Sequence, residues 1–176
     1  SLDKVFASVI DSDGQGYRIS ARYMVACDGG RSPVRRALGI KMEGSSFAEP
    51  WLIIDLKTTL NRGCQTEVFC DRTRPGITLP GPNGIHRYEF KLHPYEDFNE
   101  VIEEKFVRRL MVSVGPDADQ PLRRGRVFTF HARVAARWRQ GRVFLTSDAA
   151  HFSPPFAGQG MNSGLRDAHN LAWKLD

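Results

Sequence analysis

The stretch that decides the fold is Gly141-Arg142-Val143-Phe144-Leu145-Thr146-Ser147-Asp148-Ala149-Ala150-His151. Residues 141–146 form a short apolar run, which is typical of a buried β-strand, and Asp148 follows directly after it. A carboxylate just beyond the carboxyl end of a buried strand lies where open α/β sheets bind their ligands, and it accepts hydrogen bonds from sugar or ribityl hydroxyls. We therefore expect a ligand site at this point of the chain.

The loop after this strand favours a flat ligand. Its prolines and glycines are Pro154, Pro155, Gly158 and Gly160. The glycines have no Cβ atoms, so a planar molecule can approach their backbone closely. A helix is expected from about Met161, and its first N–H groups and positive dipole end point at the loop. Together these features predict a site for a hydroxylated, planar, redox-active cofactor.

Two other kinds of site are disfavoured here. Asp148 and His151 have no third metal ligand nearby, so no metal site is predicted. Ser147, Asp148 and His151 do not form a hydrolase triad, because the glycines of a nucleophile elbow are missing. We expect His151 to be a structural, hydrogen-bonding histidine. The helical stripe expected to face the core is Met161, Leu165, Ala168, Ala172 and Leu175.

Elsewhere in the chain, two further regions have a clear pattern. Near the start, strands are expected at 5–10 and 17–27, followed by Asp28-Gly29-Gly30 and a short helix that begins at Ser32-Pro33 and ends at Gly39. The middle of the chain predicts an antiparallel sheet followed by a helix, with strands at 51–56, 67–70 and 85–92 and the helix at 97–111. Arg87 falls opposite the apolar face of its strand, so it is not chosen as a ligand residue.

Composition narrows the class of protein. The chain has 176 residues with 41% hydrophobic and 26% charged residues, which is ordinary globular composition, and a net charge of +5. No apolar run is long enough for a membrane helix, and no secretory signal is visible. The late arginines come without a helix-turn-helix or an aromatic RNA motif, so they favour a face that attracts an anionic cofactor or substrate over nucleic-acid binding. These arginines are Arg123, Arg124, Arg126, Arg133, Arg137, Arg139 and Arg142.

The number and spacing of the cysteines indicate the cellular compartment. Cys27, Cys64 and Cys70 are an odd number at spacings that suit neither a zinc site nor a redox pair. We expect them to be small packing residues in a reducing, cytoplasmic compartment.

The late motif resembles the second flavin motif of the single-component FAD-dependent aromatic hydroxylases. The matching segments are 141–151, 154–164, 167–168 and 170–175. Residues 27–32 with Val34 and Arg35 look like the DG motif of the same family. In the middle, residues 51–55, Cys70-Asp71 with Arg74-Pro75, and residues 87–90 are similar to the 3-(3-hydroxyphenyl)propionate hydroxylase branch.

The resemblance implies a mixed α+β and α/β fold: part of a Rossmann-like FAD-binding domain, with an inserted, mostly antiparallel substrate sheet. The implied boundaries are 1–48 and 125–176 for the FAD-binding parts and 49–124 for the substrate domain. Asp148 would bind the ribityl or pyrophosphate side of FAD. Asp28, Gly29 and Arg35 of the DG motif would also be cofactor-binding residues, with Asp28 and Gly29 near the pyrophosphate. Pro154 and Pro155 would line the reactive edge of the ring. Its pyrimidine edge would be held by Gly158, Gly160, Met161 and Asn162.

The reaction of the family implies the partners. FAD is reduced by NAD(P)H, reacts with O2 to form a flavin hydroperoxide, and hydroxylates a phenolic aromatic acid. No nucleic-acid or membrane partner is expected, and no catalytic residue is assigned. Ser147 stands where the family usually has glycine. No G-x-G-x-x-G loop opening a helix is found, so we expect an internal fragment that alone binds FAD weakly or not at all and is inactive. The alternatives are a polyketide hydroxylase or halogenase on the same scaffold, or a non-catalytic domain.

Overall fold

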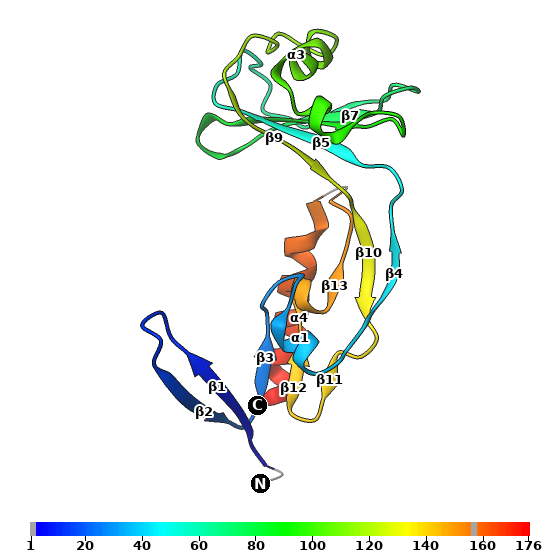
Figure 1. Ribbon diagram of the computed structural model, residues 1–176. Helices are drawn as coiled ribbons and strands as arrows, with labels where there is room; N and C mark the ends of the chain where they lie inside the picture. The colour runs from blue at the N-terminus through cyan, green and yellow to red at the C-terminus, as the bar shows by residue number, and fades with distance from the viewer. Residues whose placement is uncertain (1–2, 156–157) are drawn as a thin grey trace. The chain divides into compact units, whose positions relative to one another are not determined.

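The computed structural model of the protein describes residues 3–155 and 158–176 (Figure 1). Contacts group these residues into two compact units. Unit 1 is formed by the chain up to Ser46 together with Phe130–Asp176, and unit 2 by Phe47–Thr129. The structure is mixed α/β with several antiparallel sheets, as predicted. Unit 2 is thus inserted in sequence between the two parts of unit 1.

A three-stranded sheet with the order β11-β12-β3 forms the centre of unit 1. β3 (Met24–Ala26) and β12 (Val143–Leu145) run parallel, and β11 (Arg139–Gln140) is antiparallel to β12. The strand predicted at the late motif is therefore confirmed. Apolar side chains from both parallel strands enter a small core, whose buried members are Ala26, Ile40, Ala135, Leu145 and Ala150.

A hairpin of β1 (Val5–Ile10) and β2 (Gly16–Ala21) precedes this sheet. The first strand is confirmed, but the prediction of one strand over 17–27 is wrong. The chain bends after β2, and β3 leaves the hairpin to pair with β12. At the bend the Met24 amide donates to the Arg142 carbonyl at 3.0 Å, and the Arg142 guanidinium lies 5.1 Å from the Tyr23 ring centroid. These partners are distant in sequence, so the local pattern does not show the break.

The short helix after the DG motif is confirmed as α1 (Pro33–Ala37). The Ser32 hydroxyl oxygen accepts from the Arg35 amide at 2.9 Å, which caps the helix as predicted. A second antiparallel sheet follows, of order β13-β10-β4, with β4 (Met42–Ser46), β10 (His131–Ala135) and β13 (His151–Phe152). Its strands are largely polar and short, so hydrophobic alternation did not predict them.

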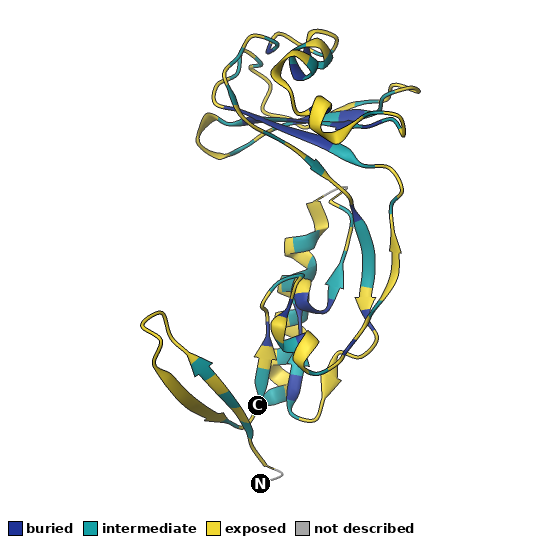
Figure 2. Ribbon diagram, in the orientation of Figure 1, coloured by how far each residue is buried: buried dark blue, intermediate teal, exposed yellow. Residues whose placement is uncertain are grey.

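Unit 2 is built on a five-stranded antiparallel sheet of order β6-β7-β8-β5-β9. Its strands are β5 (Trp51–Leu56), β6 (Glu67–Phe69), β7 (Gly76–Pro80), β8 (His86–Lys91) and β9 (Leu122–Phe128), with a 3-10 turn, η1 (Pro82–Gly84), joining β7 to β8. The three expected strands are confirmed. Burial alternates along β8, as the sequence predicted, with His86, Tyr88 and Phe90 on the core face. The run of buried residues along β5 is dark blue in Figure 2.

Two short helices cover the core face of this sheet. The single helix predicted over 97–111 is wrong, because the chain is interrupted between α2 (Phe98–Val101) and α3 (Glu104–Val112). Asp97 caps α2 by accepting from the Asn99 amide at 2.8 Å. The interruption lets both helices turn an apolar side to the sheet, where Val101, Val107 and Met111 are buried.

The last helix, α4 (Gln159–Leu175), begins close to the predicted position, but its packing face differs from the prediction. Most of the expected core stripe is exposed: Met161 has 75% and Leu165 62% of its surface accessible, and only Leu175 is half-buried. The helix instead contacts the 3-10 turn η2 (Ser147–Ala149) through Gly164 and Asp167. The prediction of a helix is confirmed, but the predicted packing face is wrong. Gly164 and Asp167 make the contact with η2, and neither is a hydrophobic residue. Within residues 3–155 and 158–176, no helix is long and apolar enough to cross a membrane.

Candidate functional site

Parallel pairing of β3 and β12 brings the two predicted motifs together. The Thr146 amide donates to the Ala26 carbonyl at 3.1 Å, and the Thr146 hydroxyl lies 3.0 Å from the Cys27 sulfur. Asp28 and Asp148 therefore follow the carboxyl ends of two neighbouring parallel strands. This edge of a parallel sheet is where α/β proteins bind their ligands.

Asp28 is held in place by the start of α1. Its carboxylate accepts from the Val34 amide at 3.0 Å. Partial burial raises the pKa of Asp28, but hydrogen bonds from the Ser32 hydroxyl and the Val34 amide outweigh that effect, so the pKa lies below its usual value. Gly29 follows with a φ of +80°, a conformation that favours glycine. Asp28 is thus a fixed carboxylate that stays ionised at neutral pH.

Arg35 connects the two motifs from behind the strand ends. It is buried, with 6% of its surface accessible. Its guanidinium donates to the Ala149 carbonyl at 2.9 Å and to the Gly30 carbonyl at 2.7 Å. These bonds fix the backbone of the DG motif against the backbone of the late motif. Arg35 is therefore a positioning residue for both segments.

Ser147 has an unusual backbone conformation. Its φ is +54°, in the left-handed region that glycine adopts most easily. The Ser147 amide donates to the Asp167 carboxylate of α4 at 2.8 Å. Its hydroxyl lies against the same helix, because a Cβ built on Gly164 would be only 2.6 Å from Ser147 Oγ. The side chain that stands in place of the family's glycine is thus directed at α4.

His151 and Asp167 complete this contact. Their Nε2 and Oδ2 atoms are 2.7 Å apart, and the His151 ring stacks on Trp138 with centroids 5.4 Å apart. The prediction that His151 is a structural, hydrogen-bonding residue is confirmed. Asp167 was not chosen from the sequence, although its helical spacing from Gly164 is the signal that places both on one face.

The remaining predicted site residues are Asp148, which follows β12, and residues just before and within the first turn of α4. Asp148 is exposed and makes no hydrogen bond to another described residue. Gly158 is the N-cap of α4, with a φ of +62° and no side chain to cap the first amides. Pro154 is half-buried; the exposed residues nearby are Pro155, Met161 and Asn162, and Gly160 has open space where a Cβ would point. Phe156 and Ala157 of this motif lie outside the described residues.

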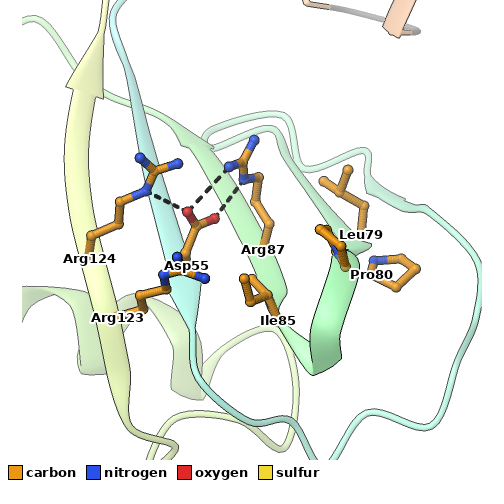
Figure 3. A pocket seen from close by; sticks show the side chains of 9 residues that line it. Asp55, Leu79, Pro80, Ile85, Arg87, Arg123 and Arg124 are labelled. Atoms are coloured by element: carbon orange, nitrogen blue, oxygen red, sulfur yellow. Dashed lines mark hydrogen bonds and ion pairs between the residues drawn. The ribbon is translucent and has the colours of Figure 1, made fainter.

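Unit 2 carries a separate cavity of about 490 Å³ on the sheet face opposite its core (Figure 3). Asp55 lies at its centre, with 4% of its surface accessible. Its carboxylate accepts from Arg87 Nε at 2.7 Å and from Arg124 Nε at 2.5 Å. The cavity is lined by Asp55, Leu79, Pro80, Gly81, Pro82, Ile85, Arg87, Arg123 and Arg124. The sequence placed Arg87 on this face but gave no sign of its partners, which come from other strands.

The cysteines differ from their predicted role. Cys27, Cys64 and Cys70 are free and exposed. The prediction that they are packing residues is wrong, because Cys27 and Cys70 follow the ends of β3 and β6 and Cys64 lies in the loop before β6.

Comparisons with known proteins agree with the motifs. The chain is 45% identical over 166 residues to a 3-(3-hydroxy-phenyl)propionate/3-hydroxycinnamic acid hydroxylase of Burkholderia cenocepacia, a match that covers 93% of this chain and 30% of the relative. It is 42% identical over 174 residues to the enzyme of the same name from Klebsiella pneumoniae, covering 98% of this chain and 31% of the relative. The chain thus spans about a third of the length of these relatives.

Solved structures show the same fold. Aklavinone-11 hydroxylase in complex with FAD and aklavinone superposes with a TM-score of 0.83 at 28% identity, over 98% of this chain and 34% of that one. The p-nitrophenol 4-monooxygenase of Pseudomonas putida superposes with a TM-score of 0.82 at 25% identity, over 98% of this chain and 45% of that one. The FAD binding domain family matches residues 2–176. The chain therefore belongs to the FAD binding domain family.

Proposed function

We propose that this chain is the central part of an FAD-dependent monooxygenase that uses NAD(P)H and O2 to hydroxylate a phenolic aromatic acid. The observation that carries the proposal is the placement of Asp28 and Asp148 at the ends of parallel strands β3 and β12. Two motifs far apart in sequence are thereby brought to one edge of a sheet, where ligands bind. The relatives named as 3-hydroxyphenylpropionate hydroxylases support the substrate class.

The proposal gives each unit a role. Unit 1 would supply the Rossmann-like FAD-binding parts, expected from the sequence at 1–48 and 125–176, and unit 2 the inserted substrate domain, expected at 49–124. Strand β9 lies wholly in unit 2. The antiparallel sheet and its cavity support the second assignment. Free thiols at all three cysteines agree with a cytoplasmic enzyme.

Residues of unit 1 fit a flavin in their chemistry. The free carboxylate of Asp148 is suited to accept hydrogen bonds from ribityl hydroxyls, and Asp28 with Gly29 would lie near the pyrophosphate. The uncapped first turn of α4 leaves the Gly160 and Met161 amides as donors toward the ring's pyrimidine edge, and Asn162 would lie beside them. Pro154 and Pro155 would exclude water along the reactive edge. Arg35 would keep both motifs aligned.

In this proposal the cofactor supplies the redox chemistry, and the protein binds and orients the cofactor. Bound FAD supplies electron transfer and activation of O2. The chain binds and orients it, and the positive end of the α4 dipole stabilises negative charge on the ring. No side chain of the described residues is assigned as an acid or a base.

Asp148 provides the test. In the full-length protein we expect Asp148→Ala to raise the Kd for FAD about tenfold or more, because hydrogen bonds to a charged acceptor are lost. Asp13→Ala is the matched control, since Asp13 is an exposed carboxylate in the turn of the β1–β2 hairpin. Flavin content after gel filtration and a fluorescence titration of the apoprotein give both values. Equal FAD affinity in the Asp148 variant and the control would reject this role for Asp148.

A polyketide hydroxylase is the second candidate, because the superposition on aklavinone-11 hydroxylase is close. Stimulation of NAD(P)H oxidation separates the two. Phenylpropanoid acids should stimulate it under our proposal, whereas stimulation by polycyclic substrates alone would favour the second candidate.

A further inference from the structure

Strand β9 contains a β-bulge beside the cavity of unit 2. Along its pairing with β5, Asp55 is opposite Arg124, whereas Leu56 is opposite Leu122. Arg123 is therefore an extra residue with no partner in the ladder. Bulges interrupt the ladder and are enriched near active sites, where they redirect a side chain.

The bulge explains the burial pattern of β9. Leu122 and Val127 both pack against the core of unit 2, although an odd number of positions separates them. In a regular strand two such residues would face opposite sides of the sheet. With one extra residue inserted, Arg123 and Arg124 both line the cavity on the other face.

The cavity consequently has an excess of positive charge. Arg87, Arg123 and Arg124 line it, against the single carboxylate of Asp55 (Figure 3). Asp55 engages the Nε atoms of Arg87 and Arg124, and Glu89 lies 3.8 Å from Arg87. Arg123 forms no hydrogen bond or ion pair with the rest of the described chain. The charge left available for a ligand is thus on Arg123 and on the outer nitrogens of Arg124.

The rest of the cavity is apolar. Leu79, Pro80 and Ile85 form the wall beside the arginines in Figure 3. A volume of about 490 Å³ is within the range of sites for small organic ligands. A guanidinium cluster next to an apolar wall matches a ligand that has a carboxylate at one end and a hydrophobic body at the other.

We propose that this cavity is the specificity site for the substrate's carboxylate. Arg123 and Arg124 bind the carboxylate, the apolar wall contacts the carbon skeleton, and Asp55 is a positioning residue that fixes Arg124 and Arg87. The proposal rests on the function proposed above and deepens it, because it states which end of an aromatic acid is recognised and by which strand.

Arg123→Gln in the full-length protein is the test, since Arg123 has no described protein partner whose loss would disturb folding. The probes are 3-(3-hydroxyphenyl)propionate and its uncharged primary amide. We expect the variant to raise KM for the acid about 10- to 100-fold, with kcat little changed, because a charge-assisted contact is lost. KM for the amide should stay unchanged. Arg126→Gln is the matched control, because Arg126 is exposed on the same strand and does not line the cavity.

A binding measurement keeps this inference separate from the proposed function. Calorimetric titration with 3-phenylpropionate, which has a carboxylate and no phenol, requires neither turnover nor NAD(P)H. We expect binding by the wild type and the Arg126 variant and a matching loss in the Arg123 variant. Equal affinities of wild type and Arg123 variant, or no binding to either, would overturn the carboxylate site. A wild type that binds 3-phenylpropionate but shows no substrate-stimulated NAD(P)H oxidation would instead count against the proposed function alone.

Discussion

At the scale of single residues, Ser147 and Gly164 form one coupled contact. Ser147 has a φ of +54°, and the left-handed conformation costs a non-glycine residue about 1–2 kcal/mol. We expect Ser147→Gly to raise the free energy of unfolding by a few tenths to about 1 kcal/mol, because relief of this strain exceeds the greater chain entropy of glycine. Urea denaturation of the full-length protein measures the difference.

The partner residue supplies the control. A Cβ on Gly164 would lie 2.6 Å from Ser147 Oγ, so Gly164→Ala alone should destabilise by about 1–3 kcal/mol. In the Ser147→Gly background the same change should cost much less, since the clashing hydroxyl is gone and alanine favours the helix. Additive free energies in this double-mutant cycle would show that the two side chains do not meet.

At the scale of elements, a buried hydrogen bond ties β8 to the turn segment between α3 and β9. The Tyr88 hydroxyl donates to the Asp117 carboxylate at 3.0 Å, and burial, then this hydrogen bond, raises the pKa of Tyr88 to about 12. A raised pKa stabilises the fold below pH ~10 and loses that effect as the pH rises from ~10 toward about 12. Tyr88→Phe should therefore lower stability by about 1 kcal/mol at neutral pH and weaken the alkaline dependence.

Tyr95 is the matched control for this prediction, because 82% of its surface is accessible. Tyr95→Phe should leave both the neutral stability and the alkaline dependence unchanged. Urea unfolding of the three proteins from neutral pH to about pH 11 gives the comparison. An alkaline loss of stability that is the same in wild type and Tyr88→Phe would contradict a native role for the Tyr88 hydroxyl.

How well an element could be predicted depended on where its partners lie. Strand β8 alternates in sequence because one face meets the core, and the structure confirms it. In α4 the period was visible, but the contacting face was set by Gly164 and Asp167, which hydrophobicity does not mark. The bulge in β9 could not be predicted from the alternation of apolar and polar residues, because the extra residue Arg123 breaks that alternation beside Arg124. Local patterns therefore show which segments are regular, and tertiary contacts decide their ends and faces.

At the scale of the whole molecule, the sequence predicts the site formed by contiguous motifs but not the cavity of unit 2. The DG motif and the late motif were recognisable because each is contiguous, and pairing of β3 with β12 brings them together. The cavity of unit 2 takes residues from β5, β7, β8 and β9 and from the turn between β7 and β8, so no contiguous motif marks it. In the sequence, Asp55 is one polar residue within an apolar strand. Its ion pairs are with Arg87 and Arg124, which come from the neighbouring strands β8 and β9.

Our central proposal is that this chain is part of an enzyme that transfers oxygen from O2 to a phenolic acid. The most direct measurement is turnover of 3-(3-hydroxyphenyl)propionate by the full-length protein with FAD, NAD(P)H and 18O-labelled O2, followed by mass spectrometry. NAD(P)H supplies two electrons, one oxygen atom enters the ring, and the other leaves as water. We predict a hydroxylated product that carries one 18O atom. NAD(P)H oxidation without a hydroxylated product, or a product whose new oxygen comes from water, would contradict the account.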